Sequence, residues 1–513
     1  PVTNDQAENA AFAQQLAAER RFLTGDEDVR PKLCVALSGG GIRSAAFSLG
    51  VLQSLHATGA LKDVQVVSAV SGGTYALSWL LLQPYYAVVS GGQSDSVDTA
   101  LSTMFDDSGA FQRNLRERSS FVELQVAGFN AFYDATMGQI FRAALRGNTY
   151  TRKGYATQIQ LAFHDHPRSG SDDVLESTNR LTLAAQLQSL ADSLWIVRSV
   201  EFSKGGRGTI DTEVGAVTGL TTEANGMLEF LEGTRSGGAT RLPYPIFNVK
   251  LNVNDARAHA DMLWPGHFEI TPLGIGGPAV GYTGWEKMSG AGYRPIRSVN
   301  IAPAVSGAAL SGYAQAVPRP VRALMRFLNT DLGYYVPNPF TASPRDVYLS
   351  DGGHLENLGL YALIRRECEQ VVAVDAEYEP DATSADAKYK FEAYDKLTKA
   401  IEAEGVAKLT LDNESDVAAF RSAKPFFKGR LDYSGSKRSG SLVYIKLALD
   451  RAEMDGLPPE VLRYATDEHP RFPHDPTLNQ SYAPEQFQAY QKLGYHIGCR
   501  ALADAPLGTT RCQ

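Results

Sequence analysis

The sequence predicts a three-layer α/β fold, in which helices cover both faces of a mostly parallel central sheet. Residues 33–82 read as strand, helix, strand and helix with short connections, which is typical of parallel sheets. The two strands, Leu33–Leu37 and Val64–Val70, are near-continuous apolar runs, as expected for strands that are buried on both faces. A third apolar run of this kind, Gln370–Val374, follows a helical pattern far downstream.

The expected elements follow the chain in order, and two of the helices have clear end signals. A polar helical repeat covers residues 10–22. The helix expected over 44–58 ends at Gly59, and the helix expected over 74–82 ends before Pro84. Beyond these, we expect helical segments within 121–145 and 181–197, strands at 244–254 and 346–349, a helix at 356–366, the strand 370–374, a helix at 387–404, a strand at 442–449 and a helix at 484–501.

No linker divides the chain cleanly, so we expect one elaborated α/β domain. Its main part spans residues 31–380, with insertions and loops at about 90–240 where the pattern is Gly- and Thr-rich. We expect residues 1–30 to form an N-terminal helical extension and residues 381–513 a C-terminal extension packed on the same domain.

Composition narrows the function classes. The 513 residues are 43% hydrophobic and 21% charged, which indicates a globular chain. A net charge of −8 argues against nucleic acid as a partner, because phosphate neutralisation needs clustered Lys and Arg. The most apolar stretch, 75–89, is broken by Gln83 and Pro84, so we expect no transmembrane helix. A soluble protein, cytoplasmic or peripheral at a membrane, is the expectation, with the compartment left open because the chain starts at Pro1.

The four cysteines suggest no metal site. Cys34 lies in a predicted core strand and Cys368 follows a helix, so both are interpreted as small buried hydrophobic residues. Cys499 and Cys512 are close enough in sequence for a disulfide, although the pattern does not require one. No Cys/His spacing suggests zinc, and we expect neither a metal nor another cofactor.

Three segments carry residues suited to chemistry. The first is Ser71, in the sequence Ala-Val-Ser-Gly-Gly (69–73) between an apolar strand and a helix. An acyl-transfer nucleophile needs such a sharp turn with small neighbours, as in G-x-S-x-G, and here Ala69 replaces the first glycine. The alternative is a serine that only caps the following helix.

The second segment is the glycine loop Gly39-Gly40-Gly41, which is followed by Arg43. Backbone N–H groups at a helix N-terminus bind an anion, either a phosphate or the oxyanion of a tetrahedral intermediate, and one oxyanion donor is worth about 3 kcal/mol. A dinucleotide loop is the alternative, but Ser44 stands where G-x-G-x-x-G has glycine, and the next strand ends at Ser71 instead of an acidic residue.

The third segment is Asp351-Gly352-Gly353 at the end of another apolar run, where the glycines let the carboxylate lie over the sheet edge. Alone, it reads as an ordinary turn aspartate. Together, SGGGIRS (38–44), AVSGG (69–73) and SDGGHLENLG (350–359) resemble the patatin-like phospholipases and the cytosolic phospholipases of the same superfamily. The resemblance covers about residues 32–378, and residues 470–498 are similar to the tail of large bacterial members.

The resemblance implies an α/β/α patatin-like fold and a serine lipid acyl hydrolase that cleaves glycerolipid esters. It implies Ser71 as nucleophile and Asp351 as the acid of a Ser–Asp dyad, with Gly40, Gly41, the supporting Gly39 and the adjacent Gly72 at the oxyanion and substrate site. Arg43 matches an arginine that assists phosphate or oxyanion binding. Lipid or a membrane surface is the implied substrate, and no protein partner is implied.

Several alternatives stay open. A Ser–Asp–His triad would take its histidine from His354, His469, His474 or His496, and Asp375 is a weaker candidate acid. Residues 321–328 and, less clearly, 138–146 read as basic amphipathic helices, suited to a bilayer surface or to covering the sheet. A nucleotide-binding module and an inactive membrane or protein scaffold are the other function classes.

Overall fold

The structure is a computed structural model of the chain. It describes residues 4–90, 96–118, 163, 227–236, 241–252, 262–285, 302, 306, 334–336, 347–379, 389–412, 424–449, 454–466, 469–477, 479, 480, 482–505, 507, 508, 510 and 512. The helical segments expected within 121–145 and 181–197 lie outside these residues.

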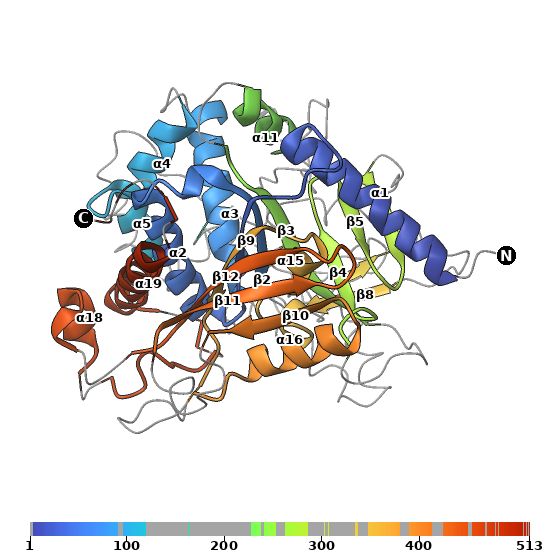
Figure 1. Ribbon diagram of the computed structural model, residues 1–513. Helices are drawn as coiled ribbons and strands as arrows, with labels where there is room; N and C mark the ends of the chain where they lie inside the picture. Colours follow the sequence, from blue (N-terminus) through green and yellow to red (C-terminus); the bar gives the residue numbers. More distant parts are fainter. Residues whose placement is uncertain are drawn as a thin grey trace, which may run out of the picture.

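A twelve-stranded sheet crosses the molecule (Figure 1). Its continuous order is β10-β11-β12-β9-β1-β2-β3-β4-β5-β6, with β8 on β3 and β7 on β8. Pairing is parallel from β12 through β9, β1 and β2 to β3, and antiparallel elsewhere. The strands are β1 (Leu33–Leu37), β2 (Val64–Val70), β3 (Tyr244–Asn252), β4 (His267–Ile270), β5 (Gly274–Gly277), β6 (Gly281–Gly284), β7 (Tyr334–Val336), β8 (Val347–Asp351), β9 (Gln370–Asp375), β10 (Ala407–Leu411), β11 (Phe426–Tyr433) and β12 (Ser439–Lys446).

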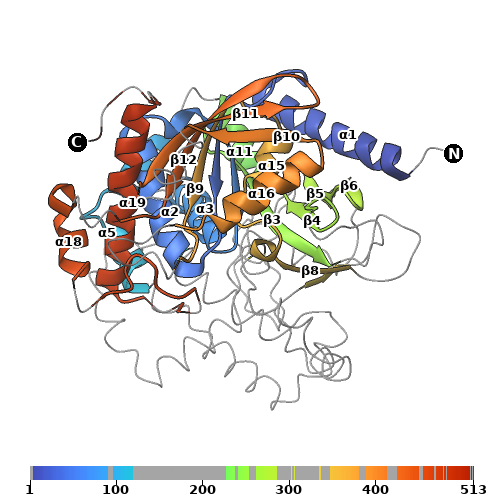
Figure 2. The ribbon, with the colours of Figure 1, turned by 60° about the horizontal axis from the view of Figure 1, so that its bottom comes forward.

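Helices cover both faces of the sheet, as the predicted three layers require (Figures 1 and 2). Helices α2, α3 and α19 pack on one face, and α1, α15 and α16 on the other. The described helices are α1 (Asn4–Thr24), α2 (Gly41–Ala57), α3 (Gly72–Tyr85), α4 (Val97–Phe105), α5 (Ala110–Arg118), α11 (Met227–Ser236), α15 (Tyr361–Arg365), α16 (Glu392–Ala403), α18 (Pro459–Tyr464) and α19 (Pro484–Asp504). In this part of the chain, none combines the length and hydropathy needed to cross a bilayer.

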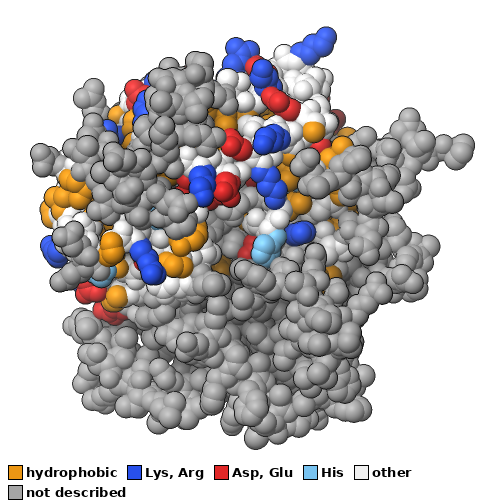
Figure 3. Space-filling view, turned by 90° about the horizontal axis from the view of Figure 1, so that it is seen from below, with side chains coloured by type: hydrophobic (Ala, Val, Ile, Leu, Met, Phe, Trp, Pro, Cys, Tyr) orange, Lys and Arg blue, Asp and Glu red, His pale blue; other side chains and the backbone are white. Residues whose placement is uncertain are grey.

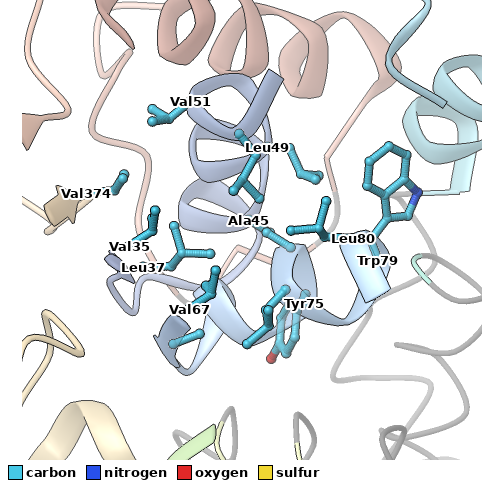
Figure 4. Close-up of a cluster of buried hydrophobic side chains, with 14 of the residues drawn as sticks. Val35, Leu37, Ala45, Leu49, Val51, Val67, Tyr75, Trp79, Leu80 and Val374 are labelled. Carbon is cyan, nitrogen blue, oxygen red and sulfur yellow. The ribbon is translucent and has the colours of Figure 1, made fainter. Parts of the chain in front are cut away.

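The apolar strands supply two hydrophobic cores, because alternate residues of a strand point to opposite faces. In β1, Val35 and Leu37 belong to the core under α2 and α3, while Cys34 and Ala36 belong to the core under α15 and α16. This double burial explains why β1 reads as a continuous apolar run. Figure 4 shows side chains of the first core pointing toward one another from β1, β2, β9, α2 and α3, including Val35, Leu37, Ala45, Leu49, Val67, Tyr75, Leu80 and Val374.

The C-terminal helix α19 lies alongside α2 near the start of the chain (Figure 2). Two glycines allow this approach. A Cβ on Gly50 of α2 would lie 1.9 Å from the backbone oxygen of Gln491, and a Cβ on Gly494 of α19 would lie 2.2 Å from that of Phe47. The first core therefore contains residues from both ends of the sequence. The boundaries predicted at residues 30 and 380 stay predictions.

Two expectations about local structure are wrong. Helix α3 does not end before Pro84 but includes it and runs to Tyr85. Cys34 and Cys368 are not buried thiols: they form a disulfide, because β1 pairs with β9 and Cys368 lies just before β9. Cys499 and Cys512 form a second disulfide. The central sheet with helices on both faces confirms the predicted three-layer α/β fold class. The expectation of a mostly parallel sheet holds only for its centre, from β12 through β9, β1 and β2 to β3, because the strands added at both edges pair antiparallel.

Candidate active site

Ser71 lies on a strained turn between β2 and α3. Its backbone has φ 47° and ψ −122°, a conformation that non-glycine residues rarely adopt. The following glycines are pressed against the first loop: a Cβ on Gly72 would lie 2.0 Å from the backbone oxygen of Gly41, and one on Gly73 would lie 2.5 Å from that of Leu37. The two glycines of AVSGG are therefore needed for the contact between the two turns. Ala69 is a fully buried residue of β2.

The pairing register of β3 with β2 and with β8 places Asp351 next to Ser71. Strand β3 pairs with β2 up to Asn248, which is opposite Val70, and its next residue, Val249, is opposite Asp351 of β8. Because β4 occupies the other edge of β3 at these residues, β2 and β8 lie on the same edge and their ends meet. The Ser71 hydroxyl donates to Asp351 Oδ2 at 3.1 Å, across 280 positions of sequence.

The buried position of Asp351 sets its proton affinity. Asp351 is 3% exposed, and burial raises the pKa of its carboxyl from 3.8 to about 7. Hydrogen bonds from the Gly353 N–H, at 2.7 Å to Oδ1, and from the Ser71 hydroxyl lower the pKa in part. The carboxyl therefore changes protonation near neutral pH, as a general base requires.

The glycine loop follows β1 and faces the same turn. Gly40 and Gly41 have φ 138° and 62°, which favour glycine, and a Cβ on Gly40 would lie 2.9 Å from the backbone oxygen of Ala376. Neither N–H makes a hydrogen bond to another described residue. The Gly39 N–H is already used, since it donates to the Asn357 carbonyl at 2.8 Å. Gly40 and Gly41 thus offer free donors, while Gly39 joins the loop to the segment after Asp351.

Arg43 is fully buried, and most of its donors are bound to the protein. Nε and one terminal nitrogen donate to the Ala376 carbonyl at 3.2 and 3.1 Å, and further bonds reach the Asp475 carbonyl and Thr477 Oγ1. The guanidinium also lies 5.3 Å from the ring centroid of Tyr378. Arg43 therefore ties α2 to the loop after β9 and to the C-terminal segment, while leaving a positive charge at the site.

Residues without a sequence signal complete the turn around Ser71. The Ser71 N–H donates to Ser306 Oγ at 2.9 Å, and Ser306 Oγ donates to the Asn248 carbonyl at 2.6 Å. This backbone N–H is therefore not available to an oxyanion. Sequence reasoning missed Ser306, because nothing around an isolated serine indicates a contact across 235 positions.

A cavity of about 350 Å³ contains both groups of the pair. Charges of both signs line it: Arg43 and Lys396 are basic, and Asp351, Glu356, Glu377 and Glu392 are acidic. Burial raises the pKa of Glu377 to about 7. Figure 3 shows acidic and basic side chains interspersed on the described part of one face. The other lining residues are Gly40, Ser71, Gly353, His354, Asn357, Tyr378, Ala393, Leu397 and Thr477.

The structure does not place a histidine on the Ser71–Asp351 pair among the described residues. His354 lines the cavity, and burial lowers its pKa, but its ring makes no hydrogen bond to either group. His474 accepts from the Glu379 N–H at 3.3 Å, and His469 stacks on Tyr464. His496 lies on α19.

Asp375, the substitute acid, is bound elsewhere: Lys446 Nζ and the Tyr444 hydroxyl each donate to it at 2.7 Å. The described residues contain no group of three or more acidic, His or Cys side chains that could hold a metal. The amphipathic segments 321–328 and 138–146 lie outside the described residues.

Comparisons with known proteins support the fold. Human GIVD cytosolic phospholipase A2 has a TM-score of 0.53 to this chain at 14% identity, over 98% of this chain and 64% of the enzyme. The same enzyme in complex with methyl gamma-linolenyl fluorophosphonate gives 0.48 at 16% identity, over 98% and 63%. No protein-family model matches the chain, and a search of curated proteins found no relative. The first similarity shows a phospholipase-like fold, and the chain spans less than two thirds of that enzyme's length.

Proposed function

We propose that the chain is a serine hydrolase that cleaves fatty-acyl esters of glycerolipids through a Ser71–Asp351 dyad. The observation that carries the proposal is the hydrogen bond between the Ser71 hydroxyl, on a strained turn, and a buried carboxyl whose pKa is about 7. The N–H groups of Gly40 and Gly41, which bond to no other described residue, lie at the N-terminus of α2 beside that turn. The phospholipase-like fold supports a lipid substrate by analogy.

In the first step, Ser71 Oγ attacks the ester carbonyl carbon while Asp351 takes the hydroxyl proton. The oxyanion would accept hydrogen bonds from Gly40 and Gly41, each worth about 3 kcal/mol in sites of this type. The tetrahedral intermediate then expels the alcohol, which takes the proton from Asp351, and the acyl group stays on Ser71. General-base assistance contributes about 10²–10⁴-fold to such a step.

In the second step, water attacks the acyl carbon and gives its proton to Asp351. Ser71 Oγ leaves, recovers the proton, and the fatty acid is released. Arg43 does not need to contact the substrate in this scheme. Its buried charge lies near the oxyanion position, and its bonds to the Ala376 carbonyl and Thr477 hold the loops around it.

The two disulfides provide evidence on the compartment in which the protein acts. Disulfides persist in oxidising compartments and are rare in the reducing cytosol. All four cysteines of the chain are paired. We therefore favour an oxidising compartment over the cytoplasm. Action at a lipid surface stays a prediction.

The test is fatty-acid release from a mixed panel of phospholipids, lysophospholipids, galactolipids and glycerides. Wild type should release fatty acid and bind a fluorophosphonate probe covalently, whereas Ser71→Ala should do neither. Asp351→Asn should lose at least about 100-fold in rate. A scaffold would bind lipid without releasing fatty acid, and a nucleotide-binding module would retain nucleotide and ignore the probe. Either result in wild type contradicts the proposal.

A further inference from the structure

Asn357 is a polar residue in the cavity for which the proposed mechanism has no role yet. It lies six positions after Asp351, and its backbone carbonyl accepts the Gly39 N–H at 2.8 Å, which fixes its main chain beside the glycine loop. Its side chain is half-buried and lines the cavity. Among the described residues, no hydrogen-bond partner is found for its side-chain amide.

The neighbouring glycines locate this amide. A Cβ on Gly39 would lie 2.2 Å from Asn357 Oδ1 and 3.1 Å from Ser71 Cβ. The distance between Asn357 Oδ1 and Ser71 Cβ is therefore no more than the sum of these two distances. A Cβ on Gly353 would lie 2.8 Å from Asn357 Oδ1 and 3.0 Å from Asp351 Oδ1. The amide oxygen therefore lies close to both members of the dyad.

The second half of the reaction needs a polar group at such a place. The attacking water must present a lone pair to the acyl carbon on Ser71 Oγ while it gives a proton to Asp351. One carboxylate acceptor leaves the water free to rotate, whereas a second acceptor fixes both of its O–H bonds and so aims its lone pair. Asn357 Oδ1 lies close enough to both groups to be that second acceptor.

We propose that Asn357 is a positioning residue for the water that hydrolyses the acyl-enzyme, an inference that rests on the proposed function above. The water donates one hydrogen bond to Asp351 and the other to Asn357 Oδ1. Its oxygen forms a bond to the acyl carbon, the proton passes to Asp351, and the bond to Ser71 Oγ breaks as that oxygen recovers the proton. Asn357 takes no part in the formation of the acyl-enzyme, in which water is not a reactant.

Burst kinetics with p-nitrophenyl butyrate separates the two steps. The rapid release of p-nitrophenol reports formation of the acyl-enzyme, and the steady rate reports its hydrolysis when that step is slow. For Asn357→Ala we expect a burst rate within about twofold of wild type and a steady rate about 100-fold lower, the usual effect of misplacing a reacting group. Intact-protein mass spectrometry should show butyryl-enzyme accumulating, and hydroxylamine, a stronger nucleophile than water, should speed its turnover.

Two further variants distinguish a loss of water positioning from a folding defect. Asn357→Gln keeps an amide but moves it by one methylene, so it should show the same selective loss of the steady rate if the alanine variant does not fold. Asn114→Ala makes the same truncation on α5, outside the cavity, and should behave as wild type. Thermal unfolding of each variant reports its fold.

The outcomes separate this inference from the proposed function. If the burst and the steady rate fall equally in both Asn357 variants, or if neither changes, Asn357 does not position the water. If wild type releases no p-nitrophenol, or Ser71→Ala releases it as wild type does, the proposed hydrolase function fails first. A wild-type burst that is lost in Ser71→Ala, with a selective loss of the steady rate in Asn357→Ala, supports both.

Discussion

Replacing Asp351 should remove activity and increase stability at the same time. The folded protein holds the Asp351 proton up to about pH 7, whereas the unfolded chain releases it near pH 3.8. One pKa unit corresponds to about 1.4 kcal/mol, so the ionised carboxyl makes folding about 4 kcal/mol less favourable than the neutral one does. The residue is 3% exposed, so solvent screens this cost little.

The direction with pH follows from proton binding. Between pH 3.8 and about 7 the folded state binds one more proton than the unfolded state, so this residue makes the free energy of unfolding fall as pH rises. Its contribution is fully present below pH 3.8 and is lost above about pH 7. Asp351→Asn has a neutral side chain of similar size at every pH, so it lacks this loss.

Denaturant unfolding of wild type and Asp351→Asn at pH 4 and pH 8 checks the prediction. The two proteins should have similar stability at pH 4, and the variant should be more stable by up to about 4 kcal/mol at pH 8. Other buried acids such as Glu356 and Glu377 are present in both proteins, so their effects cancel in the difference. Wild-type kcat should rise toward a plateau above about pH 7. Parallel loss of stability in the two proteins would refute the reasoning.

Two packing features give further predictions. Gly494→Ala should destabilise the protein by about 1–3 kcal/mol, because α19 must move away from α2. Gly233→Ala, for which no described residue lies within 4 Å of the added Cβ, should be neutral or stabilising; thermal unfolding compares the two variants. Removing each disulfide should also lower the melting temperature. The chain-entropy model gives about 6 kcal/mol for Cys34→Ser, whose loop spans 334 positions, and about 3 kcal/mol for Cys499→Ser, whose loop spans 13, so equal losses would contradict it.

The parts of the fold and site that the sequence predicts are those encoded over a few consecutive residues. The apolar runs of β1, β2 and β9 indicate a buried parallel sheet. Ser71 directly follows β2 and Asp351 ends β8, and two glycines come after each of them. The short strands β5 and β6 could not be predicted, because each begins and ends with glycine, which is depleted in strands.

Contacts between distant segments could not be predicted in this way. The Cys34–Cys368 disulfide depends on knowing that β1 pairs with β9, and the bond from Ser71 N–H to Ser306 depends on where a remote residue lies. Asn357 is part of the SDGGHLENLG segment, but nothing in that pattern marks it as a site residue. Its place beside Ser71 follows only from the contact between that segment and Gly39.

The bonds of Arg43 have a consequence for how the protein is made. The guanidinium is anchored by Asp475 and Thr477, which are 432 and 434 positions later in the chain. During synthesis, the glycine loop emerges from the ribosome long before its anchor does. Under the function proposed above, the oxyanion loop would therefore be complete only after residue 477 has been translated, and earlier folding intermediates would lack a complete site for attack on lipid esters.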